Sequence, residues 1–115
     1  MYNIGYKEAM MDTQLKKGLL DVCILKCLSK NDSYGYKLIS DISEYIEISE
    51  STLYPILKRL EAQENLITYN EEHNNRTRKY YQITKLGKER LKELIKEIGK
   101  LHEVIEFIEG GNNCE

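Results

Sequence analysis

Three cationic side chains, Arg76, Arg78 and Lys79, lie within four positions of one another, directly after the polar stretch of residues 73–75. Guanidinium and ammonium groups bind phosphate oxygens, and arginine is also favoured in a narrow DNA minor groove. His and Asn are residue types that tolerate turn conformations. The pattern predicts a basic hairpin tip that contacts a nucleic acid; the alternative is a solvated turn, and Lys79 could instead brace the hairpin.

Two tyrosines, Tyr80 and Tyr81, follow the basic cluster directly. Adjacent side chains of a strand point to opposite faces, so one ring is expected in the core and the other outside. We expect Tyr80 to lie nearer the nucleic acid and Tyr81 to be buried.

A segment with small polar residues at its start, SESTLYPILKRLEAQENLI, precedes the hairpin. Ser49 or Ser51 is expected to cap a helix there. Proline is tolerated in a first turn, so Pro55 predicts a start near Ser51 or Thr52 and an end near Glu64. The side chains expected on the buried face are Leu53, Ile56, Leu57 and Leu60.

The outer face of this predicted helix carries side chains suited to base edges and phosphates: Ser51, Thr52, Tyr54, Lys58 and Arg59. Helix N-termini bind phosphate through their N–H groups, and the first turn can reach bases in a major groove. Three alternatives stay open. Ser51 could be a plain cap, Tyr54 could pack on the hairpin, and Arg59 could equally pair with a nearby acid.

A further contact point is expected where Tyr34 and Tyr36 flank Gly35, at the start of a short helix that ends near Tyr45. Their hydroxyls, together with Lys37, could hold the phosphate backbone on the near side of the groove. The alternative is that Tyr34 is a core aromatic.

The remaining elements follow from caps and periodicity. Asp12 or Thr13 is expected to cap a first helix over QLKKGLLDVCILKCLSK, and residues 31–33 to end it and cap the next. Residues 66–69 and 79–83 are predicted strands, since they are rich in aromatic and β-branched residues. Thr84 is expected to cap a long helix from Lys85 to about Glu109, closed by glycines.

This order predicts a mainly α (α+β) fold, a winged helix-turn-helix with an appended long C-terminal helix. We expect a mobile N-terminal arm over residues 1–11, a DNA-binding domain over 12–84, a dimerisation helix over 85–109 and a flexible tail over 110–115.

The predicted C-terminal helix carries an apolar stripe at alternating spacings of three and four: Leu91, Leu94, Ile98, Leu101, Ile105 and Ile108. Such spacing is typical of a helix that pairs with another helix. A small core cannot cover a stripe of this length, so we expect the distal half to pair with a second copy, and Leu15 and Leu19 to complete the interface. The alternative is a helix folded back on its own core. A two-fold dimer would suit a palindromic operator in double-stranded DNA.

Composition excludes several classes of protein. The chain has 115 residues, a net charge of −2, 31% charged residues and 1 proline, which favours one helix-rich domain. The sequence has no membrane-spanning run and no signal peptide, so a cytoplasmic location is expected. No catalytic grouping and no phosphate-binding glycine loop is visible, so we expect neither an enzyme nor a cofactor.

No metal site is expected. Cys23 and Cys27 share one face of the first predicted helix with apolar neighbours, so buried thiols are favoured over a metal or redox pair. His73 and His102 match no zinc spacing. Cys114 is expected to be an exposed thiol.

Taken together, four segments resemble the PadR family of bacterial transcriptional regulators, in the small subclass with a single C-terminal dimerisation helix. They are QLKKGLLDVCIL, SYGYKLISDI, STLYPILKRLEAQENLI and RTRKYYQITKLGKERL. The resemblance covers about residues 14 to 108. It implies a homodimeric repressor, often of detoxification, efflux or stress genes, commonly released by a small molecule.

One position departs from the drug-responsive branch that the chain resembles in size. That branch stacks planar ligands on a tryptophan of the C-terminal helix, whereas this chain has no Trp and places Ile98 there. Stacking of flat aromatic drugs is therefore not expected, although a small apolar or aromatic effector remains an option. The alternatives to a repressor are a winged-helix ligand sensor and a protein-interaction module whose main partner is not DNA.

Overall fold

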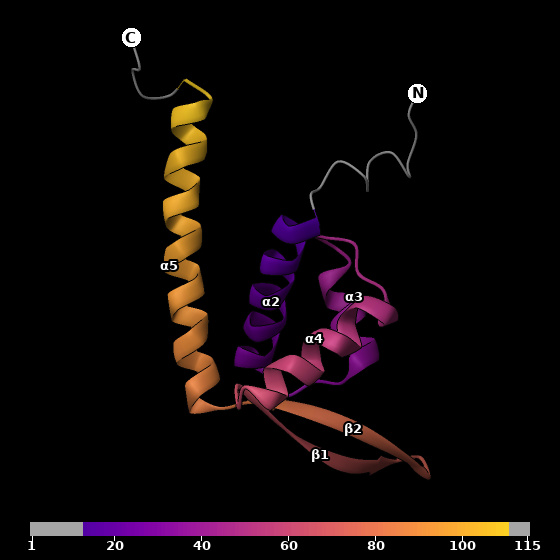
Figure 1. Ribbon diagram of the computed structural model, residues 1–115. Coiled ribbons are helices and arrows are strands. Elements are labelled where there is room, and N and C mark those ends of the chain that lie inside the picture. Colours follow the sequence, from indigo (N-terminus) through magenta and orange to yellow (C-terminus); the bar gives the residue numbers. More distant parts are fainter. Residues whose placement is uncertain (1–12, 111–115) are drawn as a thin grey trace, which may run out of the picture.

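The computed structural model describes residues 13–110 and shows the predicted order of elements (Figure 1). The elements are α2 (Thr13–Lys30), α3 (Gly35–Ile42), α4 (Glu50–Ala62), β1 (Leu66–His73), β2 (Arg76–Ile83) and α5 (Lys85–Ile108). This is a winged helix-turn-helix followed by one long helix, which confirms the predicted fold class. The expectations for residues 1–11, Asp12, Cys114 and all of the tail beyond Gly110 lie outside the described residues.

The core lies where α2, α3 and α4 pack together above the hairpin (Figure 1). Its most deeply buried side chains are Leu20, Ile24, Leu25, Leu28, Leu38, Ile42, Leu53, Leu57, Leu60 and Leu66. Those on the helices recur three or four positions apart, apart from the adjacent pair Ile24 and Leu25, so each helix buries one stripe. The predicted inner face of α4 is confirmed, since Leu53, Ile56, Leu57 and Leu60 are all buried.

The junction between α2 and α3 differs from the prediction. Ser33 does not cap α3; the N-cap residue is Tyr34, and it makes no side-chain capping bond. Ser33 instead forms a two-way backbone bridge to the wing, donating to the Tyr81 carbonyl at 3.2 Å and accepting from the Tyr81 N–H at 2.7 Å. Helix α3 ends at Ile42 and not near Tyr45 as predicted, because residues 43–45 form a turn.

Helix α4 begins one or two residues earlier than predicted. Its N-cap is Ser49 and its first residue is Glu50, so Ser51 lies inside the first turn. The placement of Pro55 in a first turn is wrong, because Pro55 is the sixth helical residue. A proline there leaves the Ser51 carbonyl without its intrahelical donor, which is tolerable because Ser51 is exposed to water.

The hairpin is longer than predicted. Its strands pair from Leu66 opposite Ile83 to His73 opposite Arg76, and the loop has two residues. Asn74 and Asn75 both have positive φ, 53° and 65°, as a two-residue turn of this kind requires. The predicted strands, residues 66–69 and 79–83, are too short at the end nearer the turn. The polar residues there are held mainly by backbone pairing and are not buried, so they carry no strand pattern in the sequence.

The expected cap of α5 is confirmed. The Thr84 hydroxyl accepts a hydrogen bond from the Gly87 N–H at 3.0 Å and donates to the Glu64 carbonyl at 2.7 Å. Gly87 is buried against the Asn65 carbonyl, so a side chain there would collide with backbone. The start of α5 is thus fixed to the loop between α4 and β1.

Replacing Gly87 with Ala should therefore lower the free energy of unfolding by about 1–3 kcal/mol, as overpacking of a tight site does. The matched control is Gly99→Ala in the middle of the same helix, where a Cβ meets nothing within 4 Å. That control should gain up to about 1 kcal/mol from helix propensity. Urea unfolding of both variants makes the comparison, and equal stabilities would contradict the close contact.

Helix α5 packs along α2 and then runs on past its end (Figure 1). Leu91 is buried and Leu94 and Ile98 are half-buried, so the first turns fold back on the chain's own core. Farther along the stripe, Leu101, Ile105 and Ile108 are 40%, 41% and 71% exposed. On α2, Leu15 is exposed and Leu19 is half-buried.

The two cysteines of α2 are half-buried against the core rather than fully buried. Burial raises the pKa of both the Cys23 and the Cys27 thiol, which keeps them protonated. Within residues 13–110, no cluster of three or more His, Cys, Asp or Glu side chains has an arrangement suited to a metal. None of the described helices is long and apolar enough to cross a bilayer.

Candidate nucleic-acid interface

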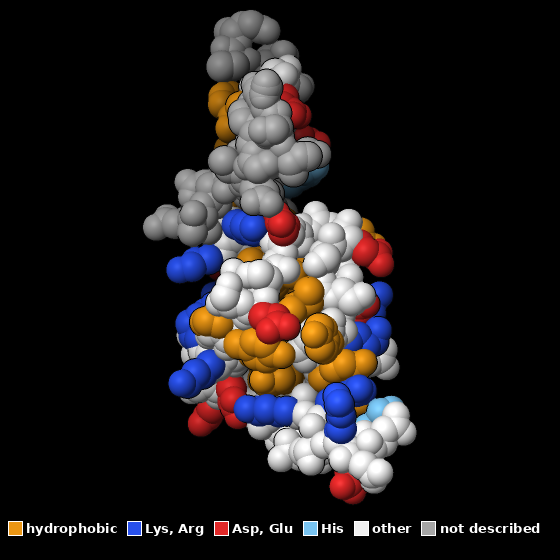
Figure 2. Space-filling model, turned by 90° about the vertical axis from the view of Figure 1, so that its right-hand side faces the viewer, with side chains coloured by type: hydrophobic (Ala, Val, Ile, Leu, Met, Phe, Trp, Pro, Cys, Tyr) orange, Lys and Arg blue, Asp and Glu red, His pale blue; other side chains and the backbone are white. Residues whose placement is uncertain are grey.

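A groove of about 530 Å³ lies between the wing, the start of α3 and Tyr54 in the second turn of α4. Six of the residues predicted to bind DNA line it: Tyr34, Tyr36, Tyr54, Arg76, Arg78 and Lys79. On the face shown in Figure 2, hydrophobic side chains gather above the hairpin tip, with lysine and arginine side chains around them. The structure thus brings the basic cluster and the exposed tyrosines, three segments far apart in sequence, to one surface.

Tyr54 lines this groove, and Gly35 leaves room for its ring. A Cβ on Gly35 would overlap the Tyr54 hydroxyl, so the Tyr54 ring can take this position only beside a glycine. Tyr54 remains 44% exposed and Tyr36 73% exposed. Both rings are therefore accessible to a ligand that enters the groove.

A stack of aromatic rings supports the wing cations. The Arg78 guanidinium lies 4.0 Å from the centre of the Tyr34 ring, a cation–π contact that orients it. Tyr34 meets Tyr80 edge-on at 5.4 Å, and Tyr80 stacks on Tyr69 at 5.5 Å. Tyr34 is accordingly a half-buried support and not a core aromatic.

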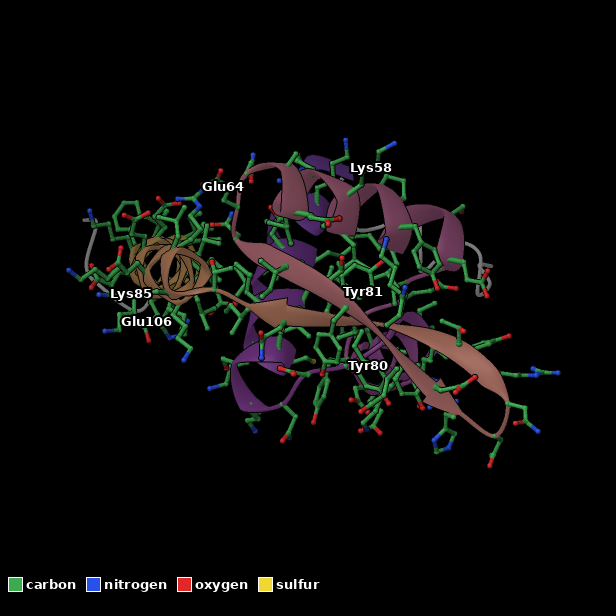
Figure 3. All side chains as sticks on the ribbon, turned by 90° about the horizontal axis from the view of Figure 1, so that it is seen from below. Lys58, Glu64, Tyr80, Tyr81, Lys85 and Glu106 are labelled. Atoms are coloured by element: carbon green, nitrogen blue, oxygen red, sulfur yellow. The ribbon has the colours of Figure 1, made fainter. Side chains whose placement is uncertain are left out.

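Tyr80 and Tyr81 point to opposite faces of the hairpin, as the alternation of a strand predicts (Figure 3). Tyr81 is 5% exposed and belongs to the core. Tyr80 is half-buried, does not line the groove and points away from α4 (Figure 3). Contact of Tyr80 with DNA stays a prediction. In the structure its ring packs against Tyr34 and supports it.

The wing is anchored at its root by Asp32, in the turn between α2 and α3. Its carboxylate accepts a hydrogen bond from the Tyr69 hydroxyl at 2.6 Å and another from the Gln82 amide at 3.2 Å. The bond to Asp32 raises the pKa of Tyr69 to about 12. These bonds and the Ser33–Tyr81 bridge fix the wing relative to the helices.

This anchor predicts an alkaline loss of stability. The folded protein holds the Tyr69 proton more tightly than the unfolded chain does. The stabilisation of the fold by this hydrogen bond is therefore complete below pH 10 and is lost as the pH rises to about 12. Tyr69→Phe should lack this component. Urea unfolding of both proteins between about pH 9 and 12 measures the difference, and parallel pH dependences would contradict the hydrogen bond to Asp32.

Hydroxyls cluster at the start of α4. The Ser49 Oγ lies 3.0 Å from the Ser51 Oγ and 3.3 Å from the Thr52 Oγ1. Because the N-cap hydroxyl makes no capping bond to the helix backbone, it leaves N–H groups of the first turn for an anion. Ser51 and Thr52 therefore sit at a helix end suited to a phosphate.

Three of the other predicted contacts lie outside the groove. Arg59 forms an ion pair with Asp21 of α2 at 2.7 Å. The alternative that Arg59 pairs with an acid thus applies, although this acid lies on another helix and not nearby in sequence. Lys37 pairs with Asp41 one turn along α3, at 3.3 Å. Lys58 is exposed on the side of α4 that faces away from the hairpin (Figure 3). Contacts of these residues with DNA remain predictions.

Sequence reasoning missed two features of this surface. Strand pairing places Glu71 opposite Arg78 and Glu72 opposite Thr77, so the wing is less basic than residues 76–79 alone indicate. It also missed Asp32, which had no signal beyond its place in a polar turn. The acids could have been found by extending the strands to the Asn74-Asn75 turn.

Comparisons with known proteins agree with this geometry. Residues 24–93 match the sequence profile of the transcriptional regulator PadR-like family. A solved protein of Streptococcus mutans UA159 is 41% identical, with a TM-score of 0.78 over 86% of this chain and 94% of its own.

Two further relatives are similar over most of their length. A PadR family transcription regulator of Clostridium difficile R20291 is 31% identical, with a TM-score of 0.73 over 79% of this chain and 98% of its own. An uncharacterised protein of Lysinibacillus sphaericus is 38% identical over 88% of this chain and 98% of its own.

Proposed function

Since the chain belongs to the PadR-like family of transcriptional regulators, which bind DNA and are not enzymes, we propose that it acts as a homodimeric repressor of a palindromic operator. The observation that carries the proposal is the groove beside the wing. There Arg76, Arg78 and Lys79 line one surface together with the exposed rings of Tyr36 and Tyr54. Cations suit the phosphates, and the first turn of α4 suits base edges.

The dimer is supported by the uncovered stripe of α5. Leu101, Ile105 and Ile108 continue the apolar face that begins in the core, yet within the described residues no part of the chain covers them. Monomeric proteins rarely leave such a face exposed to water. Pairing with the same helix of a second copy would bury it and would present two wings to two half-sites.

The regulated genes follow from the family resemblance rather than from the groove. We place the target among detoxification, efflux or stress operons, with release by a small apolar or aromatic effector. Ile98 in place of a tryptophan disfavours flat stacked drugs at the α5 pair.

Binding to the chain's own upstream DNA tests the proposal. Fluorescence anisotropy at several salt concentrations should give specific binding that weakens by about 10³ to 10⁵ between 50 and 200 mM salt, if six or more phosphates are contacted. A scrambled duplex is the control. Equal affinity for both duplexes, or no binding at low salt, would contradict an operator-specific repressor.

A further inference from the structure

A second groove, of about 480 Å³, lies between α2 and α3 and shares no lining residue with the groove beside the wing. Its size is that of small-molecule sites in proteins. Its apolar lining is Val22, Cys23, Cys27, Ile42 and Tyr45. Burial raises the pKa of both thiols, so they present themselves as apolar groups rather than as nucleophiles.

One polar group of this groove lacks a partner. Ser33 lines it and is 4% exposed, and its Oγ has no hydrogen-bond partner among residues 13–110. A buried hydroxyl left unpaired is costly and uncommon in folded proteins. An oxygen atom supplied by a ligand would accept its proton and remove that cost.

The charges around the groove cancel. Three lysines, Lys26, Lys30 and Lys37, are balanced by three acids, Asp32, Asp41 and Glu44. Lys37 is also paired with Asp41, and Asp32 already accepts two hydrogen bonds. A charged ligand would therefore gain little attraction here to offset the loss of its hydration.

We propose that the groove between α2 and α3 binds an uncharged small molecule that has an apolar body and one hydrogen-bond-accepting oxygen, with Ser33 as the donor. A ketone or an ester has this chemistry. The apolar body lies against the thiols and Ile42. The Ser33 hydroxyl is enclosed by protein in the ligand-free chain and turns toward the ligand oxygen on binding.

The site adjoins the root of the wing. Ser33 holds Tyr81 through both backbone hydrogen bonds, and its neighbour Asp32 holds Tyr69 and Gln82. A ligand bonded to Ser33 therefore shifts the wing relative to α4 and changes DNA affinity. This regulatory role rests on the proposed function, whereas binding of the ligand does not.

Titration of the full chain with 2-octanone, followed by backbone amide NMR shifts, tests the site. Saturable shifts are expected in α2 and α3. Octanoate and octylammonium, which have apolar chains of similar size, should bind more weakly. Ser33→Ala should weaken ketone binding about three- to tenfold, the worth of one hydrogen bond. The matched control is Ser40→Ala, at an exposed serine of α3 outside the groove.

Two readouts separate a lost contact from a folding defect. Since Ser33→Ala removes an unpaired buried hydroxyl, its melting temperature without ligand should equal or exceed that of the parent chain. Equal ketone affinities in Ser33→Ala and Ser40→Ala, charged probes that bind as well as the ketone, or shifts confined to other elements would overturn the proposal.

The effect on DNA is measured with the same probe. Saturating 2-octanone should change operator affinity of the parent chain, and a higher concentration should be needed for Ser33→Ala. Unchanged operator affinity with the groove filled would overturn the regulatory role. A chain that binds the ketone but ignores its upstream DNA would count against the repressor alone.

Discussion

A chain that carries Leu101→Asp and Ile105→Asp is expected to be a monomer at micromolar concentration. Fully burying one such side chain is worth about 1.5–3 kcal/mol, so the four side chains lost from a two-fold interface contribute at most about 6–12 kcal/mol. Each new carboxylate would also have to be buried without a partner, which adds to the loss. A loss of about 6 kcal/mol moves a nanomolar dimer to tens of micromolar, and a loss of about 8 kcal/mol moves it to millimolar. Operator affinity should then fall by about a thousandfold, because a single subunit contacts one half-site.

The control for this prediction lies on the opposite side of the same helix. Lys96→Asp changes the net charge by the same amount as the double substitution, and its exposed side chain is about half a turn away from the stripe. Sedimentation velocity should show a dimer for the control and a monomer for the double variant. Because Leu101 and Ile105 are already 40% and 41% exposed in one chain, unfolding is not an expected result, and circular dichroism checks this. Dimers in both variants would show that α5 pairs through another face or not at all.

The second large effect divides the predicted DNA-binding residues between affinity and specificity. Arg78→Ala should weaken binding to operator and scrambled duplexes by a similar factor, and should reduce the salt dependence by about one phosphate per subunit. Tyr54→Ala or Thr52→Ala should instead lower the preference for the operator, by about 1–3 kcal/mol for each lost base contact. The reason is position, since Arg78 is held at the wing by Tyr34, whereas Thr52 and Tyr54 lie in the first two turns of α4.

Arg90→Ala is the matched control for the loss of a cation. Arg90 lies on α5, outside the groove, and pairs with Glu93 at 3.1 Å. Salt-titrated anisotropy on both duplexes should leave this variant close to the parent chain. The assignment is contradicted if Arg78→Ala and Tyr54→Ala lose operator preference equally.

The parts of the fold that sequence predicted well are those set by local chemistry. The spacing of leucines and isoleucines predicts the buried stripes of α2 and α4. The Thr84 hydroxyl caps α5 by accepting a hydrogen bond from the Gly87 N–H, only three residues along the chain. The alternation of Tyr80 and Tyr81 follows from the geometry of a strand alone.

The parts that sequence could not predict depend on residues far apart. Arg59 pairs with Asp21 across 38 positions, and Tyr69 donates to Asp32 across 37 positions. No local pattern marks such partners, because the fold has to exist before they meet. Pro55 inside α4 is a different failure, where packing of the neighbouring leucines overrides an unfavourable local residue.

The stoichiometry of the DNA complex tests the central claim most directly. Analytical ultracentrifugation of the chain with a duplex that contains one palindromic site from its upstream region gives the number of subunits bound. Our account predicts two chains of 13.5 kDa on each duplex, bound together without a populated one-chain complex. A stable complex with a single chain on the palindrome would contradict it.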